Sequence, residues 1–193
     1  MDRPFIIFVE SAQGVGKSSC VRMLREELKY VTLLDLNAIA DKSISADRKM
    51  CDYHSSVLSL FEGCKDLGMN FVVSRSYMSE SVYATLGYKP YDFKQYAYYL
   101  RRELDYLAKF YNVCFILLTA TSEQLEERLK RNKFAYNKFS VESSLNQQQI
   151  YKDEMRLLVE DTEDVKVFEI ENNDLRKTVD TIKDIILDKM VGE

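Results

Sequence analysis

The sequence predicts an α/β protein, a three-layer α/β/α sandwich with a five-stranded parallel sheet. Apolar runs of strand length recur along the chain, helix-patterned sequence separates them, and the first run leads straight into a glycine-containing turn. Alternation of strands and helices is typical of parallel sheets with helical crossovers. A chain of 193 residues suffices for one packed core, so we expect a single domain over residues 1–193.

The expected elements follow from the hydrophobic pattern. The expected strands are apolar runs rich in Val, Ile, Leu and Phe, at residues 5–9, 31–36, 71–73, 113–118 and 165–170. The expected helices show amphipathic spacing, at residues 17–29, 47–67, 79–86, 92–111, 122–132, 145–160 and 173–190. Ser122, followed by Glu123 and Gln124, is expected to cap its helix. Ligands of such sheets bind at the carboxyl ends of the strands, so residues there are the first candidates for a site.

A phosphate-binding loop follows the first strand. Residues 10–18 read Glu-Ser-Ala-Gln-Gly-Val-Gly-Lys-Ser, one residue short of Gly-x-x-x-x-Gly-Lys-Ser/Thr because Ser11 stands at the first glycine. Successive loop amides and the start of the next helix form a nest for anions, Lys17 can reach the terminal phosphates, and Ser18 can ligate Mg²⁺. The residues expected to hold a nucleoside triphosphate are Gln13, Gly14, Val15, Gly16, Lys17, Ser18 and Ser19.

Arg75 follows the third expected strand, in the segment Ser74-Arg75-Ser76. A guanidinium at the end of a central strand lies beside the phosphate loop, and its forked geometry suits a phosphate group. In transfer between two phosphates it would also neutralise charge that repels the attacking group. Arg75 is therefore the candidate for the acceptor side of a two-substrate site.

Basic residues end the helix expected at 122–132. Arg128, Arg131 and Lys133 precede a polar and aromatic segment without clear periodicity, which we expect to form a short lid at about residues 132–144. A lid that closes with arginines on a triphosphate supplies charge and excludes water. Basic residues in a last helical turn also stabilise the helix dipole, and this alternative carries equal weight.

Two acids lie at strand ends. Asp35 ends the run Val31-Thr32-Leu33-Leu34, where it could hold Mg²⁺ through water or accept a proton, or serve only as a loop residue. A hydroxyl acceptor would need a general base, for which Asp35 and Glu10 are candidates, whereas a phosphate acceptor is already anionic.

Composition limits the partners and the compartment. A net charge of −4 argues against general nucleic-acid binding, and no apolar run is long enough to span a membrane. The four cysteines lack metal-ligand spacing and suit a reducing compartment, with the single His54 unable to complete a zinc site. We therefore expect a cytoplasmic protein.

Three segments resemble the thymidylate kinase and deoxynucleoside kinase branch of the P-loop kinases. Residues 10–18 resemble the family motif Glu-Gly-x-x-Gly-x-Gly-Lys-Ser/Thr, and residues 74–83 resemble Asp-Arg-Tyr-x-x-Ser-x-x-Ala-Tyr-Gln, with Arg75, Ser79 and Tyr83 at matching positions. The helix at 122–131 resembles the one that leads into the family's lid, with Arg128 and Arg131 on its arginines.

The resemblance implies a P-loop kinase fold, ATP and Mg²⁺ as cofactors, and transfer of the γ-phosphoryl group to a deoxynucleoside monophosphate. The expected acceptor is dTMP or dUMP, and the expected assembly is a homodimer through the helix that ends near Leu67. The roles implied are catalysis by Lys17, Arg75, Arg128 and Arg131, acceptor binding by Glu10, Asp35, Arg75, Ser79 and Tyr83, and metal binding by Ser18 and Asp35.

The chain also departs from the family pattern. Ser74 replaces an acid that helps to organise Mg²⁺, and the family's Arg-Glu-Pro-Gly is absent after Leu34. The positions of its base-stacking phenylalanine and neighbouring arginine fall near Lys49 and Tyr53. Such a divergent version would suit a large DNA virus or bacteriophage. Two alternatives stay open: a deoxynucleoside kinase with a sugar hydroxyl as acceptor, and a nucleotide-binding protein with weak catalysis.

Overall fold

The computed structural model describes residues 3–36, 43, 45–131 and 140–190. Its centre is a five-stranded parallel sheet in the order β2-β3-β1-β4-β5, which confirms the predicted fold class. The strands are β1 (Phe5–Ser11), β2 (Val31–Asp35), β3 (Asn70–Ser74), β4 (Asn112–Thr119) and β5 (Lys166–Glu171). Every pairing is parallel, so all carboxyl ends meet at one edge of the sheet.

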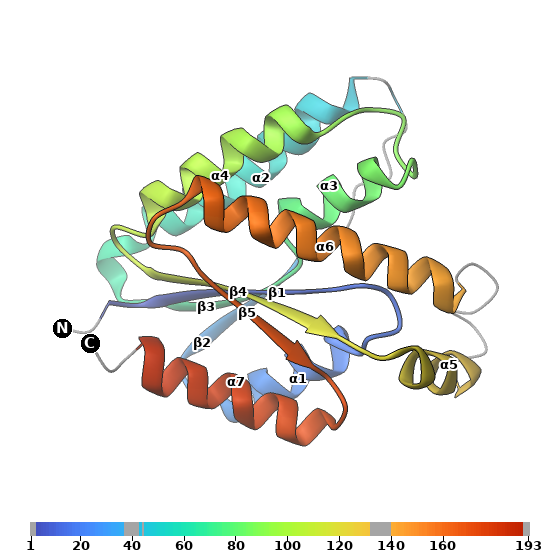
Figure 1. Cartoon of the computed structure of the whole chain (residues 1–193). Coiled ribbons are helices and arrows are strands. Elements are labelled where there is room, and N and C mark those ends of the chain that lie inside the picture. The colour runs from blue at the N-terminus through green and yellow to red at the C-terminus, as the bar shows by residue number, and fades with distance from the viewer. Residues whose placement is uncertain (1–2, 37–42, 44, 132–139, 191–193) are drawn as a thin grey trace.

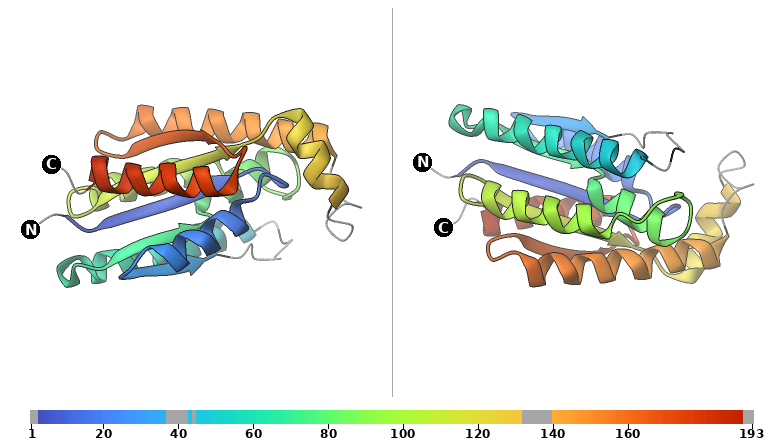
Figure 2. Two further views of the ribbon diagram at one scale, coloured as in Figure 1. Left: turned by 90° about the horizontal axis from the view of Figure 1, so that it is seen from below. Right: turned by 90° about the horizontal axis from the view of Figure 1, so that it is seen from above.

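Helices cover both faces of the sheet, giving the predicted three layers (Figures 1 and 2). One face is covered by α2 (Ala46–Gly63), α3 (Tyr77–Thr85), α4 (Lys94–Leu107) and α6 (Val141–Asp161). The other is covered by α1 (Lys17–Glu27) and α7 (Leu175–Met190). The remaining α-helix of the described chain, α5 (Ser122–Arg131), lies beyond the carboxyl ends of the strands. It therefore stands beside the edge where a ligand would bind.

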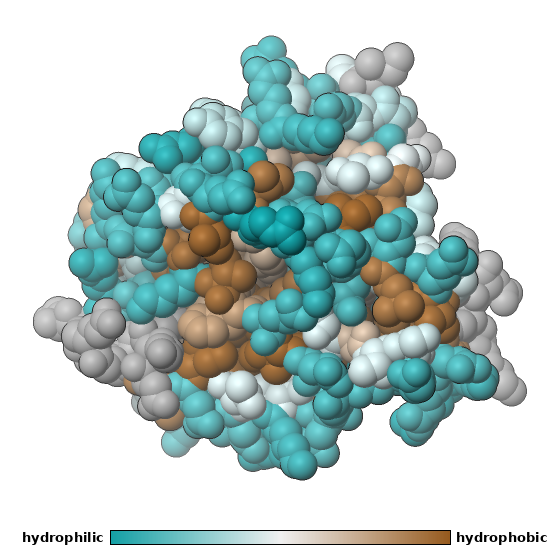
Figure 3. Space-filling view, in the orientation of Figure 1, coloured by the Kyte–Doolittle hydropathy of each residue, from teal (hydrophilic) through white to brown (hydrophobic). Residues whose placement is uncertain are grey.

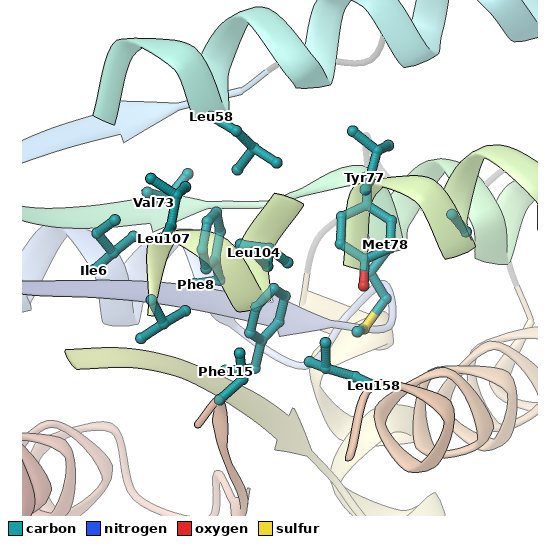
Figure 4. Close-up of a cluster of buried hydrophobic side chains, with 14 of the residues drawn as sticks. Ile6, Phe8, Leu58, Val73, Tyr77, Met78, Leu104, Leu107, Phe115 and Leu158 are labelled. Carbon is teal, nitrogen blue, oxygen red and sulfur yellow. The ribbon is translucent and has the colours of Figure 1, made fainter. Parts of the chain in front are cut away.

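The central strand β1 is buried on both faces because it has a neighbour on each side and helices above and below. Ile6 and Phe8 point into the core under α2 and α4, whereas Ile7 and Val9 point into the core under α1 and α7. Phe8 stacks on Phe115 of β4 with ring centroids 4.5 Å apart (Figure 4). This packing holds the end of β1, and with it the loop that follows.

A buried polar network joins three of the helices. Arg101 of α4 pairs with Asp161 at 2.6 Å and with Glu154 at 3.5 Å, both on α6. Ser81 of α3 donates to the other Glu154 oxygen at 2.7 Å. Burial raises the pKa of Glu154, and the bonds from Ser81 and Arg101 oppose this shift. The network fixes α3 against α4 and α6, and α3 carries candidate site residues.

The sheet edge at β5 is partly open to solvent. Figure 3 shows hydrophilic residues over the helices and hydrophobic residues between them, where the sheet lies. Glu169 of β5 pairs with Lys152 of α6 at 2.6 Å, which places charge on this edge strand and disfavours pairing with another strand. Among the described residues, no helix is long and apolar enough to cross a membrane.

The predicted start of α3 and the predicted capping residue of α5 were wrong, whereas α5 begins at Ser122 as predicted. The Ser76 hydroxyl accepts from the Met78 amide at 3.1 Å, so α3 begins at Tyr77 rather than at residue 79. Thr121, not Ser122, caps α5: its hydroxyl accepts from the Gln124 backbone amide at 3.4 Å, and its own amide donates to the side-chain oxygen of Gln124 at 2.9 Å.

The predicted lid at about 132–144 lies only partly within the described chain. Residues 132–139, including Lys133, lie outside it. The hydroxyl of Ser140 accepts from the Ser143 amide at 3.0 Å, which starts α6 at Val141. Residues 141–144 are therefore helical, so the helix predicted from residue 145 begins four residues earlier, and the lid stays a prediction.

Other boundaries shift by a few residues. Helices α1 and α4 end at Glu27 and Leu107, earlier than predicted, whereas β1 continues through Ser11. The single helix predicted over 47–67 is two elements, because α2 ends at Gly63 and a 3₁₀ turn follows at Lys65–Leu67. Helix α7 begins at Leu175 because the Asp174 side chain accepts from the Lys177 amide at 3.0 Å.

We expect the Phe8→Ala variant to lower the free energy of unfolding by about 3–5 kcal/mol, because it leaves a cavity beside Phe115 in a close-packed core. Urea unfolding followed by circular dichroism measures this change. Leu187→Ala, at an exposed position of α7, should change it by less than about 0.5 kcal/mol. Equal losses of unfolding free energy in the two variants would contradict the position of Phe8 in the packed core.

Candidate nucleotide-binding site

A cavity of about 760 Å³ lies at the carboxyl edge of the sheet. The loop between β1 and α1, residues of α3 and α5, and the turn after β5 line it. Lys17, Arg75, Arg128 and Arg131 all contribute to its wall, so the structure brings the four predicted catalytic residues around one space. Its size is that of a small-molecule site.

The loop has the backbone that an anion nest needs. Gly14 and Gly16 have φ angles of 82° and 97°, which L side chains rarely adopt. Gly16 precedes α1, and no side chain caps the first amides of this helix. Those amides and the positive end of the helix dipole are therefore available to phosphate oxygens.

Ser11 does not distort the loop. It is the last residue of β1, it pairs with Leu118 of β4, and its φ is not in the left-handed region. The strand therefore continues through the position where the usual motif has glycine, and the turn begins after it.

Lys17 and Glu10 form the buried centre of the site. Lys17 is 8% exposed, and burial lowers the pKa of its ammonium to about 8, although the charge of Glu10 acts in the opposite direction. The Glu10 carboxylate accepts from the hydroxyls of Ser76 at 2.6 Å and Ser79 at 2.8 Å. Burial raises the pKa of Glu10, against the effect of Lys17 and the two hydroxyls. The end of β1 is thus joined to the start of α3.

Arg75 is held in a strained conformation at the end of β3. Its φ is 72°, and its amide donates to the carbonyl of Val9 at 3.2 Å. A side chain with such a φ costs about 1–2 kcal/mol, and such strain concentrates at functional sites. The side chain of Arg75 lines the large cavity and also a second one.

The second cavity has a volume of about 10 Å³, room for one water molecule. Met50 and His54 of α2 and Glu80 of α3 line it beside Arg75 and Tyr83. Burial lowers the pKa of His54 to about 4, so its imidazole is neutral at physiological pH. Our sequence analysis considered His54 only as an incomplete zinc ligand, and nothing in the local sequence places it near Arg75.

Tyr83 connects the loop to α3. The side-chain amide of Gln13 lies 3.5 Å from the Tyr83 hydroxyl. Ser79, the other predicted acceptor residue of this helix, bonds to Glu10 and lies 2.9 Å from the Tyr151 hydroxyl. Tyr83 therefore faces the large cavity, whereas Ser79 is buried beneath it.

The arginines of α5 have partners. Arg128 donates from Nη1 to the carbonyl of Val15 at 2.8 Å and from Nη2 to the carbonyl of Asn172. Arg131 pairs with Glu127 on the exposed side of the helix. Among the described side-chain contacts of these two arginines, that of Arg128 reaches the phosphate loop, whereas that of Arg131 stays within α5.

Asp35 and Ser18 have the donor chemistry that Mg²⁺ prefers. Asp35 lies beside Ser74 at the sheet edge, and its charge raises the pKa of Lys17, so it acts on the same site. Within the described part of the chain, no three His, Cys, Asp or Glu side chains are grouped to hold a metal. A hydroxyl and one carboxylate fit Mg²⁺, which binds few protein oxygens and keeps waters and substrate phosphates as ligands.

The sequence analysis missed the far side of the cavity. Asn172 and Asn173 follow β5, and the side-chain amide of Gln124 of α5 donates to the side-chain oxygen of Asn173. Gln147 of α6 accepts from the Gln13 amide at 3.2 Å. The rule that ligands bind after parallel strands could have found the two asparagines, because they follow the last apolar run. Gln147 lies in the middle of a helix and carries no such signal.

The strained backbone at Arg75 should affect the free energy of unfolding of variants at this position. We expect Arg75→Gly to be more stable than Arg75→Ala by about 1 kcal/mol, because glycine adopts the left-handed conformation without steric cost. Urea unfolding of the two variants measures the difference. The matched pair at Ser74, in β3, should show the opposite order, since glycine weakens a strand. A more stable alanine variant at position 75 would contradict this account.

Comparisons with known proteins find similarity in structure alone. No family model and no curated protein matches the chain. Deoxyadenosine kinase from M. mycoides with bound dCTP is similar, with a TM-score of 0.56 and 15% identity over 95% of this chain and 99% of that one. The same enzyme with dCMP and dCDP gives 0.58 and 12% over the same shares.

Thymidylate kinase from Candida albicans gives a TM-score of 0.50 and 14% identity over 100% of this chain and 95% of that one. The chain therefore has, over its whole length, the P-loop kinase fold of deoxyadenosine kinase and thymidylate kinase.

Proposed function

We propose that this protein is a nucleoside monophosphate kinase. With ATP and Mg²⁺ it transfers the γ-phosphoryl group to a deoxynucleoside monophosphate, dTMP or dUMP, and forms the diphosphate. The observation that carries the proposal is one cavity in which the uncapped start of α1 and Lys17 face Arg75. The nucleotides named in the deoxyadenosine kinase structures support a nucleotide as the ligand.

The donor is held by the loop. The amides of residues 13–19 and the Lys17 ammonium bind the ATP phosphates, and Ser18 and Asp35 would hold Mg²⁺. When bound, Mg²⁺ would supply positive charge that offsets the negative charge of the triphosphate. Phosphoryl transfer depends mainly on position and charge, which these groups supply.

The acceptor is held on the opposite side. Arg75 binds its phosphate, and Tyr83, Ser79 and Glu10 shape the space around it. An acceptor phosphate oxygen attacks Pγ, the bond from Pγ to the bridging oxygen breaks, and ADP leaves with that electron pair. The attacking oxygen is already anionic, so no general base is required. The resemblance assigns the charge around the moving group to Arg128 and Arg131.

A second candidate is a deoxynucleoside kinase. Asp35 favours it, because a carboxylate at the sheet edge that acts on Lys17 could accept the proton of a sugar hydroxyl. The two matches to deoxyadenosine kinase point the same way.

The cellular setting is part of the proposal. We infer a cytoplasmic homodimer that forms through α2 and its neighbour α4. Support comes from exposed large apolar side chains on these helices, at Leu60, Tyr98, Tyr99 and Tyr106. Exposed apolar side chains on two neighbouring helices are available for contact with a second copy of the chain.

An assay of ATP consumption separates the candidates. We expect turnover with dTMP or dUMP, loss of it in Lys17→Ala, and a loss of about two decades in kcat/KM for the acceptor in Arg75→Ala, since one charge-assisted phosphate contact is removed. Arg156→Ala, at an exposed position of α6, is the control and should behave as the wild type.

The outcomes distinguish three functions. Turnover with thymidine or deoxyadenosine, but with no monophosphate, would show that the protein is a deoxynucleoside kinase instead. Background turnover with every acceptor, despite ATP binding, would indicate a binding protein. Acceptor kinetics of the wild type in Arg75→Ala would show that the acceptor lies elsewhere.

The pKa of Lys17 predicts a pH dependence. Phosphate binds the protonated ammonium, and the free protein loses this proton at about pH 8, so ADP affinity should fall as pH rises above about 8, by up to about tenfold per unit. Calorimetric titration with ADP between about pH 7 and 10 measures it. Lys17→Arg should flatten the curve, because guanidinium stays charged. A flat curve for the wild type would refute the assignment.

A further inference from the structure

We propose that Asn172 and Arg128 are positioning residues of the phosphate loop: they hold the carbonyl of Val15 away from the ligand and so direct the Gly16 amide toward the donor phosphates. The inference rests on the proposed binding of a nucleoside triphosphate at this loop. It gives Arg128 a role that acts through the loop backbone.

Both donors act on one carbonyl. The side-chain Nδ2 of Asn172 lies 2.6 Å from the Val15 oxygen, and Nη1 of Arg128 lies 2.8 Å from it. A carbonyl oxygen has two lone pairs, so these bonds satisfy it completely. Nη2 of Arg128 also donates to the carbonyl of Asn172, which ties the two side chains to each other.

The position of this carbonyl determines the direction of the next amide. None of the described peptide bonds is cis, and in a trans peptide the C=O and the following N–H point to opposite sides. Holding the Val15 carbonyl toward Asn172 and Arg128 therefore turns the Gly16 N–H away from them. Val15 is fully buried, whereas Gly16 lines the cavity.

Asn172 is itself held in one orientation. Its Oδ1 accepts from the buried hydroxyl of Thr178 at 2.9 Å, which leaves Nδ2 as the end that faces the loop. Its backbone amide donates to the carbonyl of Thr119 at 2.8 Å, at the end of β4. Two elements thus fix the donor before any ligand arrives, and such preorganisation is what a binding site requires.

Gly16 accommodates this contact. A Cβ at Gly16 would lie 2.8 Å from Nδ2 of Asn172, closer than real side chains approach. Glycine is therefore required here for the approach of Asn172 as well as for the φ of 97°.

Arg128 acts by geometry more than by charge. Its guanidinium donates to two separate carbonyls, which the single ammonium of a lysine cannot do in the same fork. Within the described part of the chain, Arg131 pairs only with the exposed Glu127. Of the two predicted catalytic arginines of α5, it is therefore the one that can turn to the moving phosphoryl group.

The test compares nucleotide affinity in matched variants. We expect Asn172→Ala to raise the Kd for ATP about tenfold, the effect of one buried hydrogen bond, with the KM of the acceptor unchanged. Arg128→Lys should raise it similarly although the charge is kept. The double variant should weaken binding less than the product of the single effects, because both residues hold one carbonyl.

Two further variants separate positioning from loss of the fold. Thr178→Val keeps Asn172 but frees its amide to rotate, and should raise the Kd for ATP in the same direction. Thr181→Val is the control, because its hydroxyl bonds only within α7, and it should bind as the wild type does. The ¹⁵N resonance of Gly16 should shift on ADP addition in the wild type and much less in Asn172→Ala.

The results distinguish this inference from the proposed function. A wild type that does not bind ATP would refute the function itself. A wild type that binds ATP, together with an Asn172→Ala variant within twofold of its Kd, would overturn the positioning role alone. An Arg128→Lys variant with unchanged ATP affinity but lower kcat would overturn the positioning role of Arg128. It would indicate that Arg128 contacts the transferred phosphoryl group directly.

Discussion

The buried carboxylate of Glu10 holds the two halves of the site together. It extends from the end of the central strand, accepts bonds from Ser76 and Ser79, and interacts electrostatically with Lys17. Because Ser76 also caps α3, one acid determines where that helix starts and how the strained Arg75 before it is presented. A carboxylate this deeply buried needs such partners: the two serines belong to the start of α3, and Lys17 belongs to the start of α1.

The backbone of the phosphate loop is also held by side chains from other elements. For the Gly16 amide to face the ligand, the Val15 carbonyl must face away from it. The half-buried Arg128 of α5 and the buried Asn172 after β5 donate to that carbonyl. The loop is thus shaped from outside by side chains that do not touch a phosphate. Backbone donors held in this way need little rearrangement when a charge arrives, which is how preorganised sites stabilise a moving phosphoryl group.

Much of this could be predicted from sequence, for identifiable reasons. The strands were found because buried parallel strands are continuous apolar runs, and the loop was found because its glycines, Lys17 and Ser18 are contiguous. Helix starts were missed after Ser76 and Ser140, where a local cap decided against the hydrophobic pattern. The partners of Arg128 could not be predicted, because the pairing of a side chain with distant carbonyls leaves no periodic signal. His54 and Gln147 were missed for the same reason.

The contact between Val15 and Asn172 spans 157 positions of the chain. The motif that defines the loop is complete within about the first tenth of the 193 residues. Of the two side chains that bond to the Val15 carbonyl, Arg128 comes with α5, and Asn172 comes only after the last strand. Contacts of such long range form late, because the entropy of closing a large loop must be overcome first. A folding intermediate that lacks β5 would therefore carry every residue of the phosphate motif and still bind nucleotide poorly, which makes nucleotide affinity a probe of the final folding step.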